Sequence, residues 1–157
     1  MTRIQELAEF GQSIWLDYIS RSLIEKGRIK ELVELGVRGM TSNPSIFDKA
    51  VSSGCDYDEQ IRRLKESGKS DFEIYDDLTV RDIQNAADIL RPVYEETNGF
   101  DGYVSLEINP HLARQTVETV EEGKRLHGKV DRPNGMFKVP STDEGFGAIE
   151  ALFSGGY

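Results

Sequence analysis

The chain has 157 residues, the size of one ordinary domain and well short of the roughly 250 residues of a complete (β/α)₈ barrel. It carries 19 Lys and Arg against 28 Asp and Glu, a formal net charge of −9. This balance argues against a general nucleic-acid or anionic-membrane binder, because phosphate groups select basic side chains. With 38% hydrophobic residues, the chain has enough apolar material to fold around a core.

Cysteine usage and the amino-terminal residues indicate the compartment. Cys55 is the single cysteine, so the chain has neither an internal disulfide nor a CxxC motif. The first residues, MTRIQELAEFGQ, interleave charged and apolar positions and contain no apolar run typical of a signal peptide. No segment approaches the roughly 20 apolar residues of a membrane span. We therefore expect a cytoplasmic protein without a membrane or nucleic-acid partner.

Short apolar stretches alternate with longer amphipathic ones, a pattern typical of β/α units around a parallel sheet. The sequence thus predicts an α/β fold with four βα units. Each expected strand is entered or bounded by Gly or Pro. The strands are expected at Ser13–Tyr18, Gly39–Asn43, Gly102–Ile108 and Gly135–Val139.

The segments between these strands carry helical spacing. Apolar positions predict one crossover helix over Leu23–Leu35, ended by Gly36. The segment from Pro44 to Thr97 is too long for a single helix. We expect three helices there, Ser45–Ser52, Tyr57–Glu66 and Asp71–Thr97, the last with a break near Thr79 and a disturbance at Pro92.

Capping patterns mark several helix ends. Asp56 before Glu59 and Ser70 before Glu73 are start signals. A further helix is expected over Pro110–His127, with Asn109 as its N-cap and Gly128 as its stop. The last helix is expected to begin after Ser141 or Thr142 and to stop at Gly155.

Three of the predicted strands contain an ionisable residue near the carboxyl end. Asp17 lies in IWLDYI, Glu107 in YVSLEI and Lys138 in MFKVP. Parallel strands covered by helices normally read as apolar runs, so a charge inside one is costly unless it faces a site. The carboxyl ends of the strands are also where α/β sheets and barrels place their chemistry.

Lys138 is the most informative of these residues. Its neighbours Met136, Phe137, Val139 and Pro140 would partly desolvate the amine, which favours the neutral, nucleophilic form that condenses with a carbonyl to give a Schiff base. An iminium mechanism also needs proton donors and acceptors near the nitrogen. The alternative is a lysine that snorkels to solvent.

The other candidates also have structural alternatives. Asp17 suits a turn or a cap, and Glu107 suits an ion pair with a neighbouring helix. Asn43, in TSNPS, is a good helix start because Pro44 follows it. A cap at the carboxyl end of a strand also borders the predicted pocket, so the two roles of Asn43 are compatible. His111, His127 and Cys55 are the only nitrogen or sulfur ligands apart from main chain, and we expect no metal site.

Four motifs together resemble the amino-terminal half of transaldolase, a class I aldolase-type (β/α)₈ barrel of the pentose phosphate pathway. They are WLDYISR, MTSNPSIFDKA, DGYVSLEINP and RPNGMFKVPST, in this order. The resemblance extends from about Gly11 to Gly155. The segment EIYDDLTVRDIQNAADILRPVYEETNGFDGYVSLE is similar to a bacterial branch with extra helices after the second strand.

The resemblance implies a role for each candidate residue. Lys138 would be the Schiff-base lysine, Asp17 the acid/base near the fourth substrate carbon, and Glu107 the partner that works through a water. Asn43 would contact the bound intermediate. The implied reaction moves a dihydroxyacetone unit from sedoheptulose 7-phosphate to glyceraldehyde 3-phosphate, so sugar phosphates are the expected ligands. No cofactor is implied, because the iminium serves as the electron sink.

The sequence departs from the family at three points. Tyr18 stands where that branch often has Asn, and Ser141 where it often has Ala. The family barrel continues through four more βα units, which carry the threonine that holds the catalytic water and the serine and arginines that grip the substrate phosphate. We therefore expect residues 1–157 to form a single partial domain, a half-barrel without the carboxyl-terminal half. Such a half-barrel with open strand edges must pair, misfold or belong to something larger, and a barrel-like homodimer is one arrangement that would bury the edges.

Two alternatives to a transaldolase half stay open. One is a non-catalytic half-barrel that serves as an interaction module. The other is a simple class I aldolase that forms or cleaves a hydroxyketone without transfer. Failure of any carbonyl compound to form an adduct would support the non-catalytic half-barrel. Assays that compare aldol cleavage with transfer would separate the simple aldolase from the transaldolase.

Overall fold

A parallel sheet forms the frame of the protein, which a computed structural model describes over residues 1–157. The strands pair in the order β1-β2-β3-β4, and all pairs are parallel. This is the α/β fold that the sequence predicts, and its sequential order is consistent with the first half of a (β/α)₈ barrel. The strands are β1 (Trp15–Leu16), β2 (Gly39–Met40), β3 (Val104–Glu107) and β4 (Gly135–Lys138).

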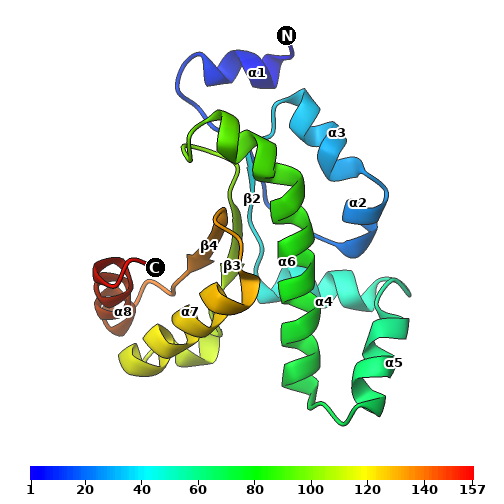
Figure 1. Ribbon diagram of the computed structural model, residues 1–157, viewed down its shortest axis with the longest axis vertical. Coiled ribbons are helices and arrows are strands. Elements are labelled where there is room, and N and C mark those ends of the chain that lie inside the picture. Colours follow the sequence, from blue (N-terminus) through cyan, green and yellow to red (C-terminus); the bar gives the residue numbers. More distant parts are fainter.

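Helices connect and cover the strands (Figure 1). The longest, α6, begins beside the lower end of α5, passes α4 and continues along the strands toward α1, while α7 and α8 pack together near β4. None of the helices combines the length and the apolar composition needed to cross a membrane. The helices are α1 (Arg3–Ala8), α2 (Arg21–Glu25), α3 (Arg28–Leu35), α4 (Pro44–Ser52), α5 (Asp58–Glu66), α6 (Asp71–Glu96), the 3₁₀ helix η1 (Pro110–Leu112), α7 (Thr116–Val130) and α8 (Asp143–Ser154).

The strands stand where the sequence places them but are shorter than predicted. After β2, side-chain hydrogen bonds replace the backbone bonds between strands. The Ser42 hydroxyl donates to the Ser105 carbonyl at 2.6 Å, and the Asn43 side chain accepts from the Ile46 amide at 2.9 Å. The Thr41 amide still donates to the Leu16 carbonyl of β1 at 2.9 Å, and the chain then leaves the sheet to begin α4. The strand predicted over Gly39–Asn43 is in the right place but too long, because β2 ends at Met40.

The single helix predicted over Leu23–Leu35 is wrong. The chain forms α2 and α3 instead, with Gly27 between them at φ +72°. A left-handed residue does not continue a right-handed helix, and glycine adopts that conformation without penalty. The stop at Gly36 is confirmed, since this residue caps α3.

The helix predicted over Pro110–His127 is also interrupted. Asn109 caps η1, as expected, but Gln115 is extended and α7 begins only at Thr116. The new start is fixed from outside the helix, because the Thr119 hydroxyl donates to the Leu112 carbonyl at 2.9 Å. Helix α7 then runs through Gly128 to Val130 and is capped by Asp131, which is in the left-handed conformation.

Of the remaining predictions for the helices, some are confirmed and others are wrong. Helix α6 has no break at Thr79 and also passes Pro92, and the Thr79 hydroxyl donates within the helix to the Asp76 carbonyl at 3.1 Å. The capping box of Ser70 is confirmed, as is α8, which begins after Thr142 and is capped by Gly155. The cap predicted at Asp56 is wrong, because the N-cap of α5 is Tyr57 and makes no side-chain capping bond.

The main core lies between the sheet and the helices. Met40, Val104 and Leu106 of the strands face the buried side of α6, which contributes Val80, Ile83, Ala86, Ala87, Leu90 and Val93. A smaller cluster under α4 and α5 contains Ala50, Tyr57, Ile74 and Leu78. Because successive strand side chains point to opposite faces, this packing leaves Glu107 and Lys138 on the face of the sheet away from the core.

Candidate functional site

The four residues predicted for the site stand at one end of the sheet. Glu107 and Lys138 are the last residues of β3 and β4, Asp17 directly follows β1, and Asn43 lies shortly after β2. Parallel strands bring their carboxyl ends to the same edge. The fold thus places one predicted residue at the end of each strand.

Lys138 and Glu107 form the centre of this group. They are paired in register across β3 and β4, and the Lys138 Nζ lies 3.4 Å from Glu107 Oε2. Their side chains are 36% and 25% exposed. The amine therefore has a carboxylate within reach for proton exchange, directly or through one water, and remains open to a ligand.

Asp17 stands apart from this pair. It follows β1, three strands away from Lys138, and in a curved, barrel-type sheet the carboxyl ends of several strands border one site. Its contact is with Thr41, whose hydroxyl donates to Asp17 Oδ1 at 2.5 Å. Sequence reasoning missed Thr41, although its place in the TSNP motif beside the end of β2 was the available signal. The structure brings together Lys138 and Glu107, and separately Asp17 and Thr41.

The side chain of Asn43 is hydrogen-bonded through its oxygen. Its Oδ1 accepts from the Ile46 amide and caps α4, which confirms the predicted capping role. Its side-chain N–H groups make no hydrogen bond in the structure. The two donors of a half-buried amide are therefore free to meet a ligand at the edge of the sheet.

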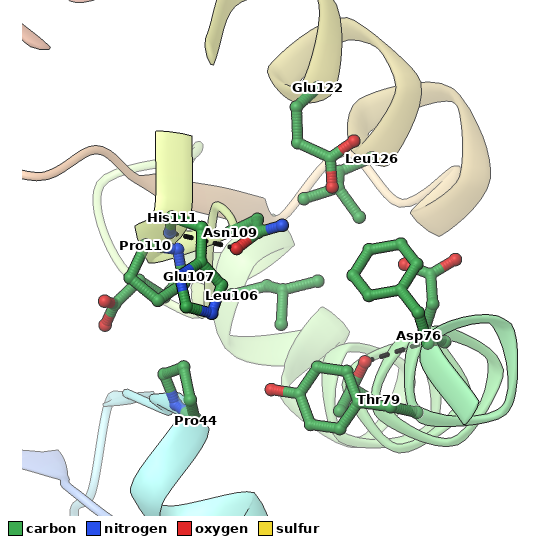
Figure 2. Close-up of a pocket in the computed structure, with 12 residues that line it drawn as sticks. Pro44, Asp76, Thr79, Leu106, Glu107, Asn109, Pro110, His111, Glu122 and Leu126 are labelled. Carbon is green, nitrogen blue, oxygen red and sulfur yellow. Dashed lines mark hydrogen bonds between the residues drawn. The ribbon is translucent and has the colours of Figure 1, made fainter. Parts of the chain in front are cut away.

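A cavity of about 210 Å³ is lined by Glu107 and by residues of α6, η1 and α7. Figure 2 shows Glu107 and His111 on one side of it, Asp76 and Thr79 of α6 on another, and Glu122 of α7 above. Of the four predicted residues, Glu107 alone lines this cavity. It is thus a neighbour of the cluster at the strand ends and not the cluster itself.

Tyr75 also lines the cavity. Burial raises the pKa of Tyr75 to about 12, and the negative charges of Glu107 and Asp76 act in the same direction. The phenol stays neutral at physiological pH and can donate a hydrogen bond there. It therefore adds a polar group behind Glu107 without adding charge.

An ionic network braces α6 against α7 beside the cavity. Arg125 donates to both carboxylate oxygens of Asp76 at 2.7 and 2.9 Å, and Lys129 reaches Asp76 and Asp77. Burial by itself would raise the pKa of Asp76, but hydrogen bonds from Arg125 and Lys129 hold it below its ordinary value. Asp76 is thereby kept charged, and its role is to join the two helices.

Other chemistry-bearing residues are dispersed. The structure groups no three His, Cys, Asp or Glu side chains in an arrangement that could hold a metal ion. Cys55 is a free, exposed thiol outside the strand ends.

Comparison with known proteins identifies the family of this constellation. The model of the Transaldolase/Fructose-6-phosphate aldolase family matches residues 14–157. Among curated relatives, Transaldolase of Thermobifida fusca is 49% identical over 98% of this chain and 42% of its own length. Transaldolase of Saccharopolyspora erythraea is 47% identical over 99% of the chain and 42% of its own length. Transaldolase 2 of a Nostoc species is 43% identical, over 99% and 41% respectively.

The match covers the chain almost completely but its relatives only in part. This chain spans about two fifths of the length of these curated relatives. The matched residues include all four strands and all four predicted site residues. The chain belongs to the transaldolase/fructose-6-phosphate aldolase family.

Proposed function

We propose that this chain carries the Schiff-base half of a transaldolase, which transfers a dihydroxyacetone unit from sedoheptulose 7-phosphate to glyceraldehyde 3-phosphate. The observation that carries the proposal is the Lys138 amine 3.4 Å from the Glu107 carboxylate, at the ends of adjacent parallel strands. A primary amine beside a proton-transfer group is what iminium formation requires. The family of the chain supports the same assignment.

In the proposed mechanism, Lys138 Nζ adds to the ketose carbonyl at C2. Glu107, through a water, donates the proton with which the carbinolamine hydroxyl leaves as water, and an iminium results. The Asp17 carboxylate then takes the proton of the C4 hydroxyl as the C3–C4 bond breaks. The electron pair of that bond moves toward the iminium and gives an enamine, while the remainder leaves as erythrose 4-phosphate.

The second half reverses these steps. The enamine carbon attacks the aldehyde of glyceraldehyde 3-phosphate, Asp17 returns the proton to the new hydroxyl, and hydrolysis of the iminium releases fructose 6-phosphate. We assign the free side-chain N–H groups of Asn43 to a hydroxyl of the bound intermediate. The protein's own amine acts as the electron sink, so the proposal needs no cofactor.

Residues 1–157 are proposed to form a single partial domain, one half of a barrel. Strands β1 and β4 each have one neighbour, so two strand edges are open. We propose that β1 of one copy pairs with β4 of a second copy, which closes eight parallel strands about a two-fold axis. Sedimentation at twice the 17.7 kDa chain mass is the expected result. A folded monomer at micromolar concentration would contradict this pairing.

A second candidate function is suggested by the family description, which also names fructose-6-phosphate aldolase. A simple aldolase would cleave the same C3–C4 bond and release dihydroxyacetone by hydrolysis. The two activities differ in the fate of the enamine. Transfer to an added aldehyde phosphate supports the transaldolase, whereas release of free dihydroxyacetone regardless of acceptor supports the aldolase.

Borohydride trapping tests the common step. Reduction in the presence of fructose 6-phosphate is expected to fix a sugar-derived adduct on Lys138, identified by peptide mass spectrometry. Lys138→Met should abolish the adduct, and Lys30→Met, at an exposed helical lysine, should leave it unchanged. An adduct on a different lysine, or none on the wild-type chain, would refute the proposed function.

A further inference from the structure

Three polar side chains are buried together where α2, α5 and α6 meet. The Arg21 guanidinium donates to Asp82 Oδ1 through Nε at 3.0 Å and Nη2 at 2.8 Å. The Tyr57 hydroxyl donates to the other oxygen, Oδ2, at 2.7 Å. A third guanidinium nitrogen donates to Gln60 Oε1 at 2.5 Å. We call Arg21, Tyr57 and Asp82 the buried triad.

The triad is almost completely buried. Arg21 is 8% exposed, Tyr57 1% and Asp82 0%. The guanidinium carbon also lies 4.5 Å from the centre of the Tyr57 ring, a cation–π arrangement. Burial raises the pKa of Asp82, while the bonds from Tyr57 and Arg21 act against that rise. A buried charge of this kind is tolerated only when its partners are held in place.

The triad also grips the main chain close to Asp17. Arg21 is the first residue of α2, and its backbone N–H donates to the Tyr57 hydroxyl at 2.9 Å. Only Tyr18, Ile19 and Ser20 separate Asp17 from this anchor. Asp17 itself is exposed and is held from the other side by Thr41. The segment 17–21 is thus fixed by the core at Ile19 and by the triad at its carboxyl end.

We infer that Arg21, Tyr57 and Asp82 are positioning residues, which act through segment 17–21 to set the place of the Asp17 carboxylate for cleavage of the C3–C4 bond. This inference rests on the proposed function. It also gives a function to α5, one of the helices between β2 and β3, because its N-cap Tyr57 and its residue Gln60 both bond to Arg21 at the start of α2. These helices thereby support a neighbouring unit of the sheet.

The mass of the trapped adduct separates positioning from general damage. Schiff-base formation uses Lys138 and Glu107, whereas the following cleavage uses Asp17. Borohydride added to the chain with fructose 6-phosphate traps a six-carbon adduct before cleavage. After cleavage, the enamine takes a proton at C3 and is reduced to a three-carbon adduct. A displaced Asp17 therefore raises the six-carbon share without lowering total labelling of Lys138.

The test variant is Tyr57→Phe, and Tyr103→Phe is the matched control. Tyr57→Phe removes two hydroxyl hydrogen bonds, to Asp82 and from the Arg21 amide. Tyr103→Phe also removes a hydroxyl, which donates one bond to the Gly99 carbonyl at 2.7 Å, but at the amino-terminal end of β3. For Tyr57→Phe we expect about a tenfold rise in the ratio of six-carbon to three-carbon adduct, since small displacements of a reacting group have large effects on rate. Total labelling should change less than about twofold. Tyr103→Phe should match the wild type.

Amide hydrogen exchange provides a second measurement. In Tyr57→Phe, the peptide covering residues 17–21 should exchange about tenfold faster, while the β4 peptide stays protected. If Tyr57→Phe does not fold, Arg21→Lys replaces it, because this variant keeps the buried positive charge and loses the fork that holds Asp82. Its expected change has the same direction and is smaller.

The outcomes distinguish the two proposals. A wild-type chain that gives no adduct on Lys138 refutes the proposed function and this inference with it. A wild-type adduct whose six-carbon share is the same in the triad variant refutes the inference alone. Equal loss of both adducts, with faster exchange throughout the chain, assigns the triad to stability and also overturns the positioning role.

Discussion

Replacing Gly102 by alanine provides a sharp test of how the sheet is supported. Gly102 connects the end of α6 to β3 and has φ +87°. A Cβ at this position would lie 2.3 Å from the Tyr94 backbone nitrogen and 2.7 Å from the Tyr94 Cα. Backbone atoms inside a helix have little freedom to move, so the start of β3 or the end of α6 must shift.

The magnitude follows from two contributions. A left-handed conformation costs a non-glycine residue roughly 1–2 kcal/mol. Overpacking against fixed neighbours adds about 1–3 kcal/mol. We expect Gly102→Ala to lower the free energy of unfolding by about 2–5 kcal/mol, which for a chain of this size lowers Tm by roughly 5–15 °C.

Gly68→Ala is the matched control. Gly68 has a similar φ of +84°, but nothing lies within 4 Å of the Cβ that alanine would add. This variant should lose only the conformational contribution, about 1–2 kcal/mol. Urea and thermal unfolding followed by circular dichroism measure both changes. Equal losses for the two variants would show that the close approach of α6 to β3 contributes nothing, and would refute the reasoning.

Three further changes probe other contacts. The pKa of Asp76 lies below its ordinary value in the folded state, so the stability from this carboxylate is complete above about pH 5 and is lost as pH falls through the folded pKa. Urea titrations should therefore show less acid destabilisation for Asp76→Asn than for the wild type, and an equal acid response would contradict this. Leu90→Ala, at a 0% exposed core position, should lower the unfolding free energy by about 2–5 kcal/mol, whereas Leu7→Ala, at a 42% exposed position, should change it by less than about 1 kcal/mol. The buried Asn134 amide donates to the Ala87 and Gly102 carbonyls, so Asn134→Asp should destabilise the chain by about 3 kcal/mol or more, because an acceptor then faces two acceptors. A Tm within one degree of the wild type would refute that last expectation.

The order and type of the strands were predictable because each is marked by apolar residues between turn signals. The charged residues at the strand ends were predictable for the same reason, since Lys138 and Glu107 interrupt such runs and then pair in register. Strand length was not predictable. The backbone hydrogen bonds to β1 end after Thr41, where Ser42 and Asn43 form side-chain bonds that depend on Ser105 and on the start of α4.

Helix boundaries failed where tertiary contacts decide them. Gly27 was a visible break signal whose effect depends on its left-handed φ. By contrast, nothing near Gly128 in the sequence shows that α7 continues past it. The end of that helix is held by a distant residue, because Gln84 of α6 donates to the Lys129 and Val130 carbonyls. Thr41 and the buried triad were missed for the same reason. The roles of these residues depend on contacts between residues far apart in the chain.

The helices between β2 and β3 also shape the order in which the chain can fold. Met40 pairs with Val104 only after a long excursion through α4, α5 and α6, and closing a long flexible loop is entropically unfavourable. The α5–α6 hairpin shortens that excursion, because its contacts are local and Tyr57 bonds to Asp82 within it. Strands β2 and β3, at the middle of the sheet, can then pair because the two ends of the segment between them are already close together. The same helices thus act first as a folding unit and afterwards as a support for the loop of Asp17.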